Sequence, residues 1–453
     1  MGIGKNKEST ALNLTEGPII KNILLFAVPL FMGQLLQQFY NVADAWVIGN
    51  FADNNAFAAV SSAGSMTFLI VGLFNGTAIG GGVIISKYYG AGERIKVVKA
   101  IHTNFLFGII ASALATVVGL VMVPHILVWM NTPESVIQNS LQYFAVYFAG
   151  VSTVIMYNIC MSIMRALGDS LRPLYYLILS SVINVLLDLL FVAVFQWGVA
   201  GAGIATVIAQ GVSVILCLIR MFRQEDYTRL DLKKLHFDKE MMEEVIKQGL
   251  PTGIQNAVIS IGNLTVQTNI NSFGPYAMAG VGAYAKIEGF VFLPIMSMSM
   301  SLPTFISQNL GAKKVDRAKK GAVFGILFGV ICAEIMGVII YLISPKFLKI
   351  FVNTPESIAY GTIHSRVTAL FFFLLALSHC AAGVLRGCGK AFIPMATMLA
   401  FWCGLRVTYV TLILKVIPEF QMISWAYPLT WSISSLVLVI ILLRMDWNKI
   451  FRG

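Results

Sequence analysis

The feature that most constrains this chain is a series of apolar segments, each long enough to cross a lipid bilayer. A transmembrane helix needs about 20 predominantly apolar residues. Such segments predict about twelve transmembrane helices, near residues 19–48, 57–82, 100–123, 137–159, 173–195, 199–222, 245–272, 277–304, 321–343, 358–383, 393–415 and 422–444. Only 12% of the residues are charged, against about 25% in soluble domains. The chain is therefore predicted to be an all-α integral membrane protein.

Basic residues lie mainly in alternate loops, and this pattern predicts the orientation. Loops rich in Lys and Arg stay on the cytoplasmic side. They follow the second, fourth, sixth, eighth and tenth predicted helices, whereas the intervening loops hold only Lys346, Lys349 and Lys415. The loops explain the net charge of +11 without a nucleic-acid partner. Both termini are predicted to be cytoplasmic, and no cleaved signal peptide is expected.

An internal duplication divides the chain. The pentapeptide NTPES at residues 131–135 returns at 353–357. Further matches at an offset of 221 or 222 residues pair Ser86 with Ser307, Arg165 with Arg386, Gly168 with Gly389, Pro173 with Pro394 and Pro29 with Pro251. Because this offset spans six helices, the two repeats run the same way through the membrane. We expect two parallel six-helix repeats (6+6) around a central cleft.

The duplication also predicts the domain organisation. We expect a cytoplasmic tail at 1–18, a six-helix lobe at 19–222, a cytoplasmic linker at 223–244, a second six-helix lobe at 245–444 and a tail at 445–453. Two such lobes suit alternating access of a transporter; a membrane scaffold or an intramembrane enzyme is the alternative. The sequence contains no HExxH, GxSxG or Walker motif, so neither enzymatic activity nor a cofactor is predicted.

Acidic residues inside the predicted helices are candidates for ion coupling, because a charge in hydrocarbon is costly and persists mainly where it functions or is paired. Asp44 shares a helical face with Tyr40 and Asn41. Asp188 lies four residues after Asn184, so these two side chains also share a face. We expect both faces to contribute to one polar site.

The depths of these residues support a common site. Asp44, Asp188 and Thr206 are all predicted to lie within about 12 Å of the outer surface, from a rise of 1.5 Å per helical residue. Two carboxylates with an amide and a hydroxyl would bind Na⁺ or share a proton. The alternative is that each Asp faces a wet cleft or bonds a neighbour and contributes only to structure.

Several motifs resemble bacterial multidrug and toxic compound extrusion (MATE) transporters over almost the entire chain. The similar features are TEGP at 15–18, the Pro29 helix ending in YNVAD at 40–44, RALGD at 165–169, the Asn184 to Asp188 spacing, GA at 311–312 and the 6+6 repeat. The resemblance implies a monomer in the bacterial cytoplasmic membrane that exports amphipathic, often cationic compounds in exchange for H⁺ or Na⁺. No obligatory protein partner is implied.

The resemblance also implies where the coupling ion binds. In the most similar branch of the family, the coupling positions fall on Asp44, Asn184, Asp188 and Thr206, the cluster already inferred from charge and depth. Another branch places carboxylates on helices 7 and 10. This chain has Gln255, Gln267, Arg366 and His379 in those helices, so a cation site of that type is not expected in the second lobe.

Other polar residues are candidates for the substrate cleft. Glu288 is predicted near the bilayer midplane, where it would attract a cationic compound; the alternative is an ion pair with Lys286, Arg366 or Arg406. Met296 would supply an adaptable apolar contact. In the first helix we expect Gln34, Gln37 and Gln38 to face the cleft, since unpaired amides are costly against lipid.

Pro29 and Pro251 lie within the first helix of each repeat and are candidate hinges, because proline removes a backbone hydrogen bond. A bend at Pro29 that responds to the state of Asp44 and Asp188 is a hypothesis for coupling. Two other functions stay open from sequence alone. One is a lipid-linked precursor flippase of the same broader superfamily, and the other is an uncoupled channel.

Overall fold

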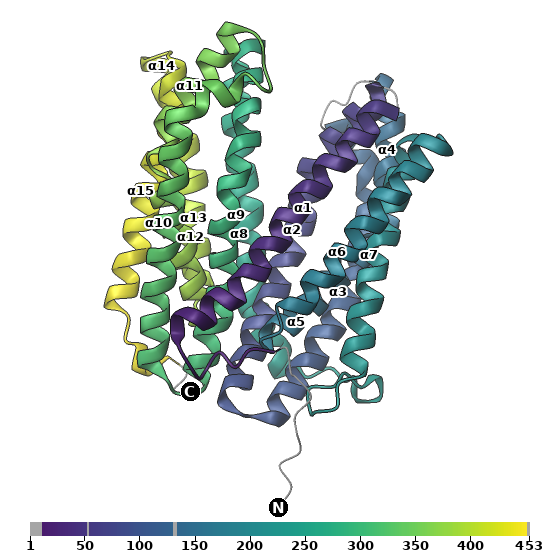
Figure 1. The fold of residues 1–453 in the computed structure, drawn as a ribbon, viewed down its shortest axis with the longest axis vertical. Helices are drawn as coiled ribbons and strands as arrows, with labels where there is room; N and C mark the ends of the chain where they lie inside the picture. The colour runs from purple at the N-terminus through teal and green to yellow at the C-terminus, as the bar shows by residue number, and fades with distance from the viewer. Residues whose placement is uncertain (1–10, 52–53, 130–133, 451–453) are drawn as a thin grey trace, which may run out of the picture. The chain divides into compact units, whose positions relative to one another are not determined.

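The chain folds into long helices in a computed structural model that describes residues 11–51, 54–129 and 134–450, with no strand among them (Figure 1). The first repeat contains α1 Ile19–Phe51, α2 Asn54–Ala91, α3 Arg94–Trp129, α4 Glu134–Ala149, α5 Val151–Ala166, α6 Leu171–Asp188 and α7 Gly198–Phe222. The second contains α8 Lys239–Asn271, α9 Pro275–Gly311, α10 Val315–Leu348, α11 Pro355–Ala369, α12 Phe372–Gly387, α13 Phe392–Met398, α14 Arg406–Val416 and α15 Phe420–Arg444. The first three residues of the NTPES motif at 131–135 lie outside the described residues, as do most of the N-terminal tail and the end of the C-terminal tail.

The duplication is visible in the helices themselves. Helix α2 starts 221 residues before α9, and the same offset separates the starts of α5 and α12 and of α6 and α13. A π-helical segment follows α6 at Leu189–Val194, and another joins α13 to α14 at Leu399–Leu405. The fifth span of each repeat therefore contains a π-helical stretch, a deviation that is often associated with functional sites.

Most of the predicted membrane spans are confirmed by helix length and composition. Eight helices among the described residues are long and apolar enough to cross a membrane, or up to ten if each of two bent pairs is one span. Helices α2 and α8, with 38 and 33 residues, occupy the positions predicted for spans 2 and 7. The fourth span of each repeat, predicted as one helix, is bent by 44° between α4 and α5 and by 54° between α11 and α12.

Specific local contacts accompany each bend. At Gly150, between α4 and α5, a Cβ atom would lie 2.2 Å from Cγ2 of Val207, so only glycine allows α7 to approach so closely. At the second bend, Glu334 of α10 accepts a 3.4 Å hydrogen bond from the backbone N–H of Phe373, which satisfies a free donor at the start of α12. The bond gives Glu334 a structural role at this bend.

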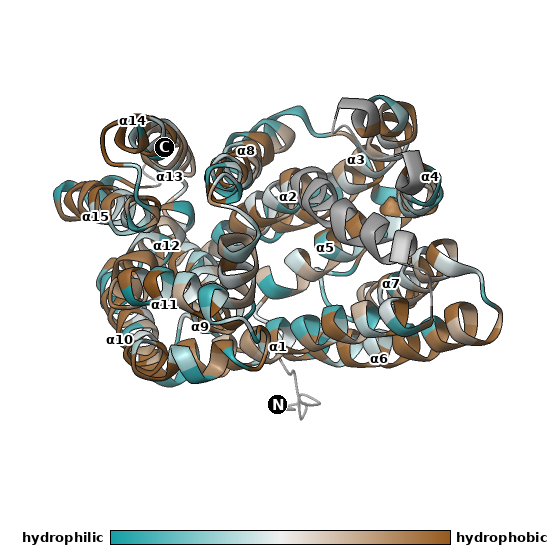
Figure 2. Cartoon of the chain, turned by 90° about the horizontal axis from the view of Figure 1, so that it is seen from above, coloured by the Kyte–Doolittle hydropathy of each residue, from teal (hydrophilic) through white to brown (hydrophobic). Residues whose placement is uncertain are grey.

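Apolar side chains on the outer helix faces match a lipid environment. On α10, Val323, Leu327, Ile331 and Ile335 recur every four residues and are each 53–58% exposed. Figure 2 shows brown hydrophobic residues along this helix. In water such a stripe would mark an interaction surface, and in a chain with this many apolar helices it fits contact with hydrocarbon.

The helices pack into two bodies whose limits differ from the predicted lobes of 19–222 and 245–444. One body consists mainly of Met32–Gly253, and the other of Leu14–Phe31 with Ile254–Gly453. The chain therefore passes from one body to the other inside α1 and again inside α8. Both crossings fall two residues after a proline, Pro29 in one helix and Pro251 in the other. This placement fits the predicted hinges. Helix α8 begins at Lys239, inside the segment 223–244 predicted as the linker.

Close contact between glycines explains why the start of α8 packs with the first body. A Cβ atom on Gly76 of α2 would lie 2.1 Å from the nitrogen of Gly253, and one on Gly80 would lie 2.2 Å from the nitrogen of Gly249. Glycines four residues apart on both helices let the two backbones touch, as at other small-residue interfaces between membrane helices. The four-residue spacing of the glycines is visible in the sequence, but the helix that each pair contacts is determined by the tertiary fold.

We predict that Gly80→Val will lower the thermal stability of the purified protein and its folded yield. The added atoms meet backbone rather than a movable side chain, so we expect a cost of at least about 1–3 kcal/mol. Gly282→Val in α9 is a matched control, because nothing lies within 4 Å of a Cβ atom there. Equal melting temperatures for the two variants would contradict the close contact.

Candidate functional site

The predicted coupling residues meet between three helices of the first body. Tyr40 and Asp44 lie in the C-terminal half of α1, Asn184 and Asp188 on α6, and Thr206 on α7. Asp188 is the last α-helical residue before the π-helical segment. Both Asp188 and Asn184 are buried, with 0% and 1% of their surfaces exposed, and Asp44 is half-buried. A polar site this well buried needs internal partners for its hydrogen-bonding groups.

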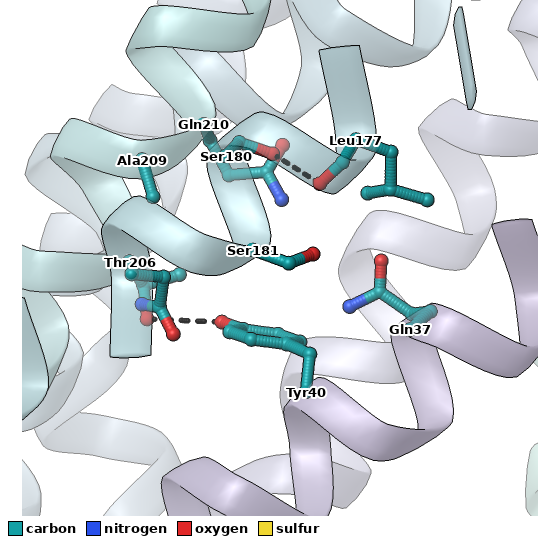
Figure 3. Close-up of a pocket in the computed structure, with 9 residues that line it drawn as sticks. Gln37, Tyr40, Leu177, Ser180, Ser181, Thr206, Ala209 and Gln210 are labelled. Atoms are coloured by element: carbon teal, nitrogen blue, oxygen red, sulfur yellow. Dashed lines mark hydrogen bonds between the residues drawn. The ribbon is translucent and has the colours of Figure 1, made fainter. Parts of the chain in front are cut away.

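Asn184 connects two of these helices. With the amide oriented so that both of its groups find partners, its nitrogen donates to Oδ2 of Asp188 at 2.9 Å, and its oxygen accepts the backbone N–H of Thr206 at 3.3 Å. Tyr40 joins the third helix, because its hydroxyl shares a 3.2 Å hydrogen bond with the hydroxyl of Thr206 (Figure 3). The four side chains therefore form one connected polar network across α1, α6 and α7.

The two carboxyl groups of the site touch each other. The side chains of Asp44 and Asp188 lie at hydrogen-bonding distance, yet a carboxylate oxygen accepts and does not donate. One buried oxygen of each, Oδ1 in both residues, has no hydrogen-bond donor. Neither carboxylate forms an ion pair within the described part of the chain. A proton or a bound cation between them would remove both the repulsion and the unmet acceptors.

A small polar pocket adjoins this carboxyl pair. It is lined by Gln37, Tyr40, Leu177, Ser180, Ser181, Asn184, Thr206, Ala209 and Gln210. Figure 3 shows Gln37 and Tyr40 of α1 opposite Ser181 of α6 and Thr206 of α7. The lining carries no charged side chain, so it can offer neutral hydrogen-bonding groups next to the two carboxyl groups.

Sequence reasoning missed three polar residues of this pocket, together with the apolar Leu177 and Ala209. Ser180 precedes Asn184 by four residues, and Gln210 follows Thr206 by four, so each lies one helical turn along the same face. That spacing was a usable signal for both, and Ser181 is the neighbour of Ser180. The hydroxyl of Ser180 donates to the backbone oxygen of Leu177, whereas Oε1 of Gln210 is buried without a donor.

Other residues predicted in the first helix lie outside the network. Asn41 is exposed and accepts a long 3.5 Å hydrogen bond from Gln37, so it does not reach the carboxyl groups. Gln34 and Gln38 are half-buried on α1 and do not line the pocket. Of the three glutamines predicted to face the cleft, Gln37 lines the pocket, whereas Gln34 and Gln38 do not.

The remaining substrate candidates lie in the second body on α9. Glu288 and Met296 are both half-buried. No ion pair joins Glu288 to another described residue. Lys286 and Arg366 are exposed, and Arg406 bonds Asn263 and Thr430 instead. The ion-paired alternative for Glu288 is therefore not observed, and its contact with substrate stays a prediction, as does that of Met296.

The described residues contain no group of three or more His, Cys, Asp or Glu that would hold a metal ion. All six cysteines are free thiols. A cation at the Asp44–Asp188 pair would therefore have to complete its coordination with hydroxyl, amide or water oxygens, which suits Na⁺ better than a transition metal.

Comparison with known proteins agrees with the duplication. The MatE family model matches the chain twice, at residues 29–190 and 251–410. The two matches begin at Pro29 and Pro251, which confirms the pairing of the first helices. Together they cover well over half of the chain.

Individual relatives extend the similarity to the full length. The chain is 26% identical to the probable multidrug resistance protein YoeA of Bacillus subtilis over 95% of this chain and 94% of that protein. It is 24% identical to the multidrug export protein MepA of Staphylococcus aureus (strain MSSA476), over 99% of this chain and 100% of that protein. An outward-facing multidrug resistance MATE family transporter has the same fold, with a TM-score of 0.91 at 18% identity over 98% of this chain and 100% of that one.

We predict that Tyr40→Phe and Thr206→Val each lower the transport rate by about two- to tenfold, because a net hydrogen bond is worth about 0.5–1.5 kcal/mol. The double variant should lose no more than either single one, since the two hydroxyl groups bond each other. Tyr175→Phe, on the exposed side of α6, is the control and should match the native protein. Losses that simply add in the double variant would contradict the shared bond.

Proposed function

The chain belongs to the MatE family, and on this premise we propose that it is an antiporter that exports amphipathic, often cationic organic compounds in exchange for H⁺ or Na⁺. The names of its relatives, multidrug resistance and multidrug export proteins, support the class of substrate. We also propose a monomer in the bacterial cytoplasmic membrane with both termini in the cytoplasm, which the distribution of basic loops supports.

One observation carries the coupling part of this proposal, namely the contact between the carboxyl groups of Asp44 and Asp188. They come from different helices, they lack a basic partner among the described residues, and each has an oxygen without a donor. Two carboxylates in contact are stable only with a cation between them. The pair therefore has the chemistry of a site that binds and releases one monovalent cation.

Release of that cation would act directly on α1. Two unscreened unit charges about 4 Å apart repel by about 4 kcal/mol at an effective dielectric constant near 20. This repulsion would push Asp44 away from Asp188 and stress the Tyr40–Thr206 hydrogen bond. Helix α1 lacks a backbone hydrogen bond at Pro29, so it can respond by bending there.

The arrangement also supports competition between cation and substrate. The polar pocket shares Tyr40, Asn184 and Thr206 with the coupling network. A change at the carboxyl pair would therefore alter the groups that a compound meets in the pocket, which is the reciprocal effect that an antiporter needs. Gln34, Gln38, Glu288 and Met296 are proposed as further substrate contacts.

We predict that Asp188→Asn strongly lowers ion-driven efflux of ethidium from proteoliposomes. The change removes the charge but keeps the shape, and a lost charge-assisted contact worth about 1.5–3 kcal/mol predicts a loss of at least about tenfold. Glu334→Gln is the matched control, because its carboxylate bonds a backbone N–H at the α11–α12 bend, and it should export normally.

Proton and sodium gradients should be imposed separately in the same assay. Native efflux that follows only one gradient identifies the coupling ion. Normal efflux by Asp188→Asn would show that the residue is structural, and native efflux that follows neither gradient would contradict the antiport proposal.

We predict that Pro29→Ala lowers the transport rate by about threefold or more while the folded yield stays near that of the native protein, because hinge changes act on the rate of conformational change. Pro124→Ala in α3 is the control, since that helix does not pass between the two bodies. Normal transport by Pro29→Ala would exclude the hinge.

A further inference from the structure

The second body contains a buried arginine that the antiport mechanism does not use. Arg406 begins α14 directly after the π-helical segment, and 1% of its surface is exposed. Its Nη1 donates to Oδ1 of Asn263 on α8 at 3.1 Å. Its Nη2 donates to Oγ1 of Thr430 on α15 at 2.9 Å, and its Nε reaches the same oxygen at 3.3 Å. One guanidinium group therefore joins three helices.

The rest of the Arg406 site is aromatic. The guanidinium carbon lies 5.1 Å from the ring centre of Trp402 and 4.7 Å from that of Tyr427. Such distances are those of cation–π contacts, which are strongest where water is excluded. No ion pair neutralises Arg406 within the described part of the chain, although Glu288 acts on it electrostatically. The charge is therefore held by oxygen atoms and rings rather than by a bonded carboxylate.

The internal repeat relates this site to the carboxyl pair. Arg406 lies on the fifth span of its repeat, as Asn184 and Asp188 do in the first repeat. At the 221-residue offset between the starts of α6 and α13, it lies one residue after the counterpart of Asn184. Asn263 lies on the first span of its repeat and Thr430 on the sixth, as Asp44 and Thr206 do in the first repeat. Equivalent spans thus form a polar site in each body, with two carboxyl groups in one and a cationic group in the other.

We propose that the guanidinium group of Arg406 is a fixed cation, which holds the second body in the way that an exchangeable H⁺ or Na⁺ holds the first. The comparison with an exchangeable ion rests on the proposed antiport function. Because the guanidinium is covalently attached and always charged, it cannot be released during transport. The second body then keeps one arrangement of α8, α14 and α15, and cation exchange is confined to the first body.

Removal of the side chain would expose a site shaped for a guanidinium ion. The oxygen atoms of Asn263 and Thr430 and the rings of Trp402 and Tyr427 would remain in place. A small soluble cation of the same shape should bind there and restore the lost contacts, because a ligand that binds only the folded state stabilises it.

The test measures thermal unfolding of the purified full chain in detergent, with and without millimolar methylguanidinium. Arg406→Ala should melt below the native protein and should recover by about 3 °C or more on addition of methylguanidinium. The matched control is Arg366→Ala, which removes an equal charge from an exposed position in the same body. Methylguanidinium should raise the melting temperature of neither this control nor the native protein. A rise for Arg406→Ala that is no larger than the rise for these two proteins would overturn the proposal.

Two further variants keep the proposal testable if Arg406→Ala does not fold. Arg406→Lys keeps the charge and Arg406→Met keeps the bulk, so Lys should melt nearer to the native protein than Met does. A Met variant as stable and as active as the native protein would overturn the proposal.

A second measurement separates this proposal from the proposed function, namely the rise in the melting temperature of the native protein when Na⁺ or H⁺ is added. This rise should vanish in Asp188→Asn, since no exchangeable cation is expected in the second body. Stabilisation that persists there and disappears when Glu288→Gln is added would overturn the fixed-cation role. Methylguanidinium rescue requires no transport, so it stands or falls independently of the antiport assay.

Discussion

Hydrocarbon cannot satisfy a polar group, and this constraint determines both the helices and the sites that they enclose. Every backbone N–H and C=O within a span must bond inside the protein, so bends occur only where something replaces the lost bonds, as Glu334 does at the start of α12. The same rule makes buried side chains informative. Where Asp44 and Asp188 leave oxygen atoms without donors in such surroundings, a transient ligand is the natural complement.

The two bodies meet this constraint with opposite chemistry. In the first, the carboxyl groups of Asp44 and Asp188 need an added positive charge, whereas in the second the positive charge of Arg406 is part of the chain. Duplication provides two equivalent sites, and divergence can then make one responsive and the other permanent. If cation exchange is confined to the first body, as we propose, only that body would change its charge during a transport cycle.

Much of this organisation was predictable from the sequence, and the exceptions share a cause. The constant offset predicted the two repeats, and helical spacing with depth brought together Asp44, Asn184, Asp188 and Thr206. Helical spacing alone also placed Asn41 near them, but the structure turns it outward. The passage of the chain between the two bodies inside α1 and α8 was not predictable. Gly249 and Gly253 indicate that their helix packs closely against another helix, but the sequence does not say which one. The bends in the fourth spans were missed for the same reason, since Val207 defines the role of Gly150 only in three dimensions.

The crossing of the chain inside α8 has a consequence for biosynthesis. Residues up to Gly253 belong to the first body, so this body is incomplete when the ribosome has delivered only the first six spans. The glycines at 76 and 80 of α2 have no partner until the start of α8 emerges. Folding of the first repeat is thus tied to synthesis of the second, and neither half of the gene encodes a self-sufficient unit, although each encodes six spans. A gene split within the linker would yield fragments that must find each other in the membrane.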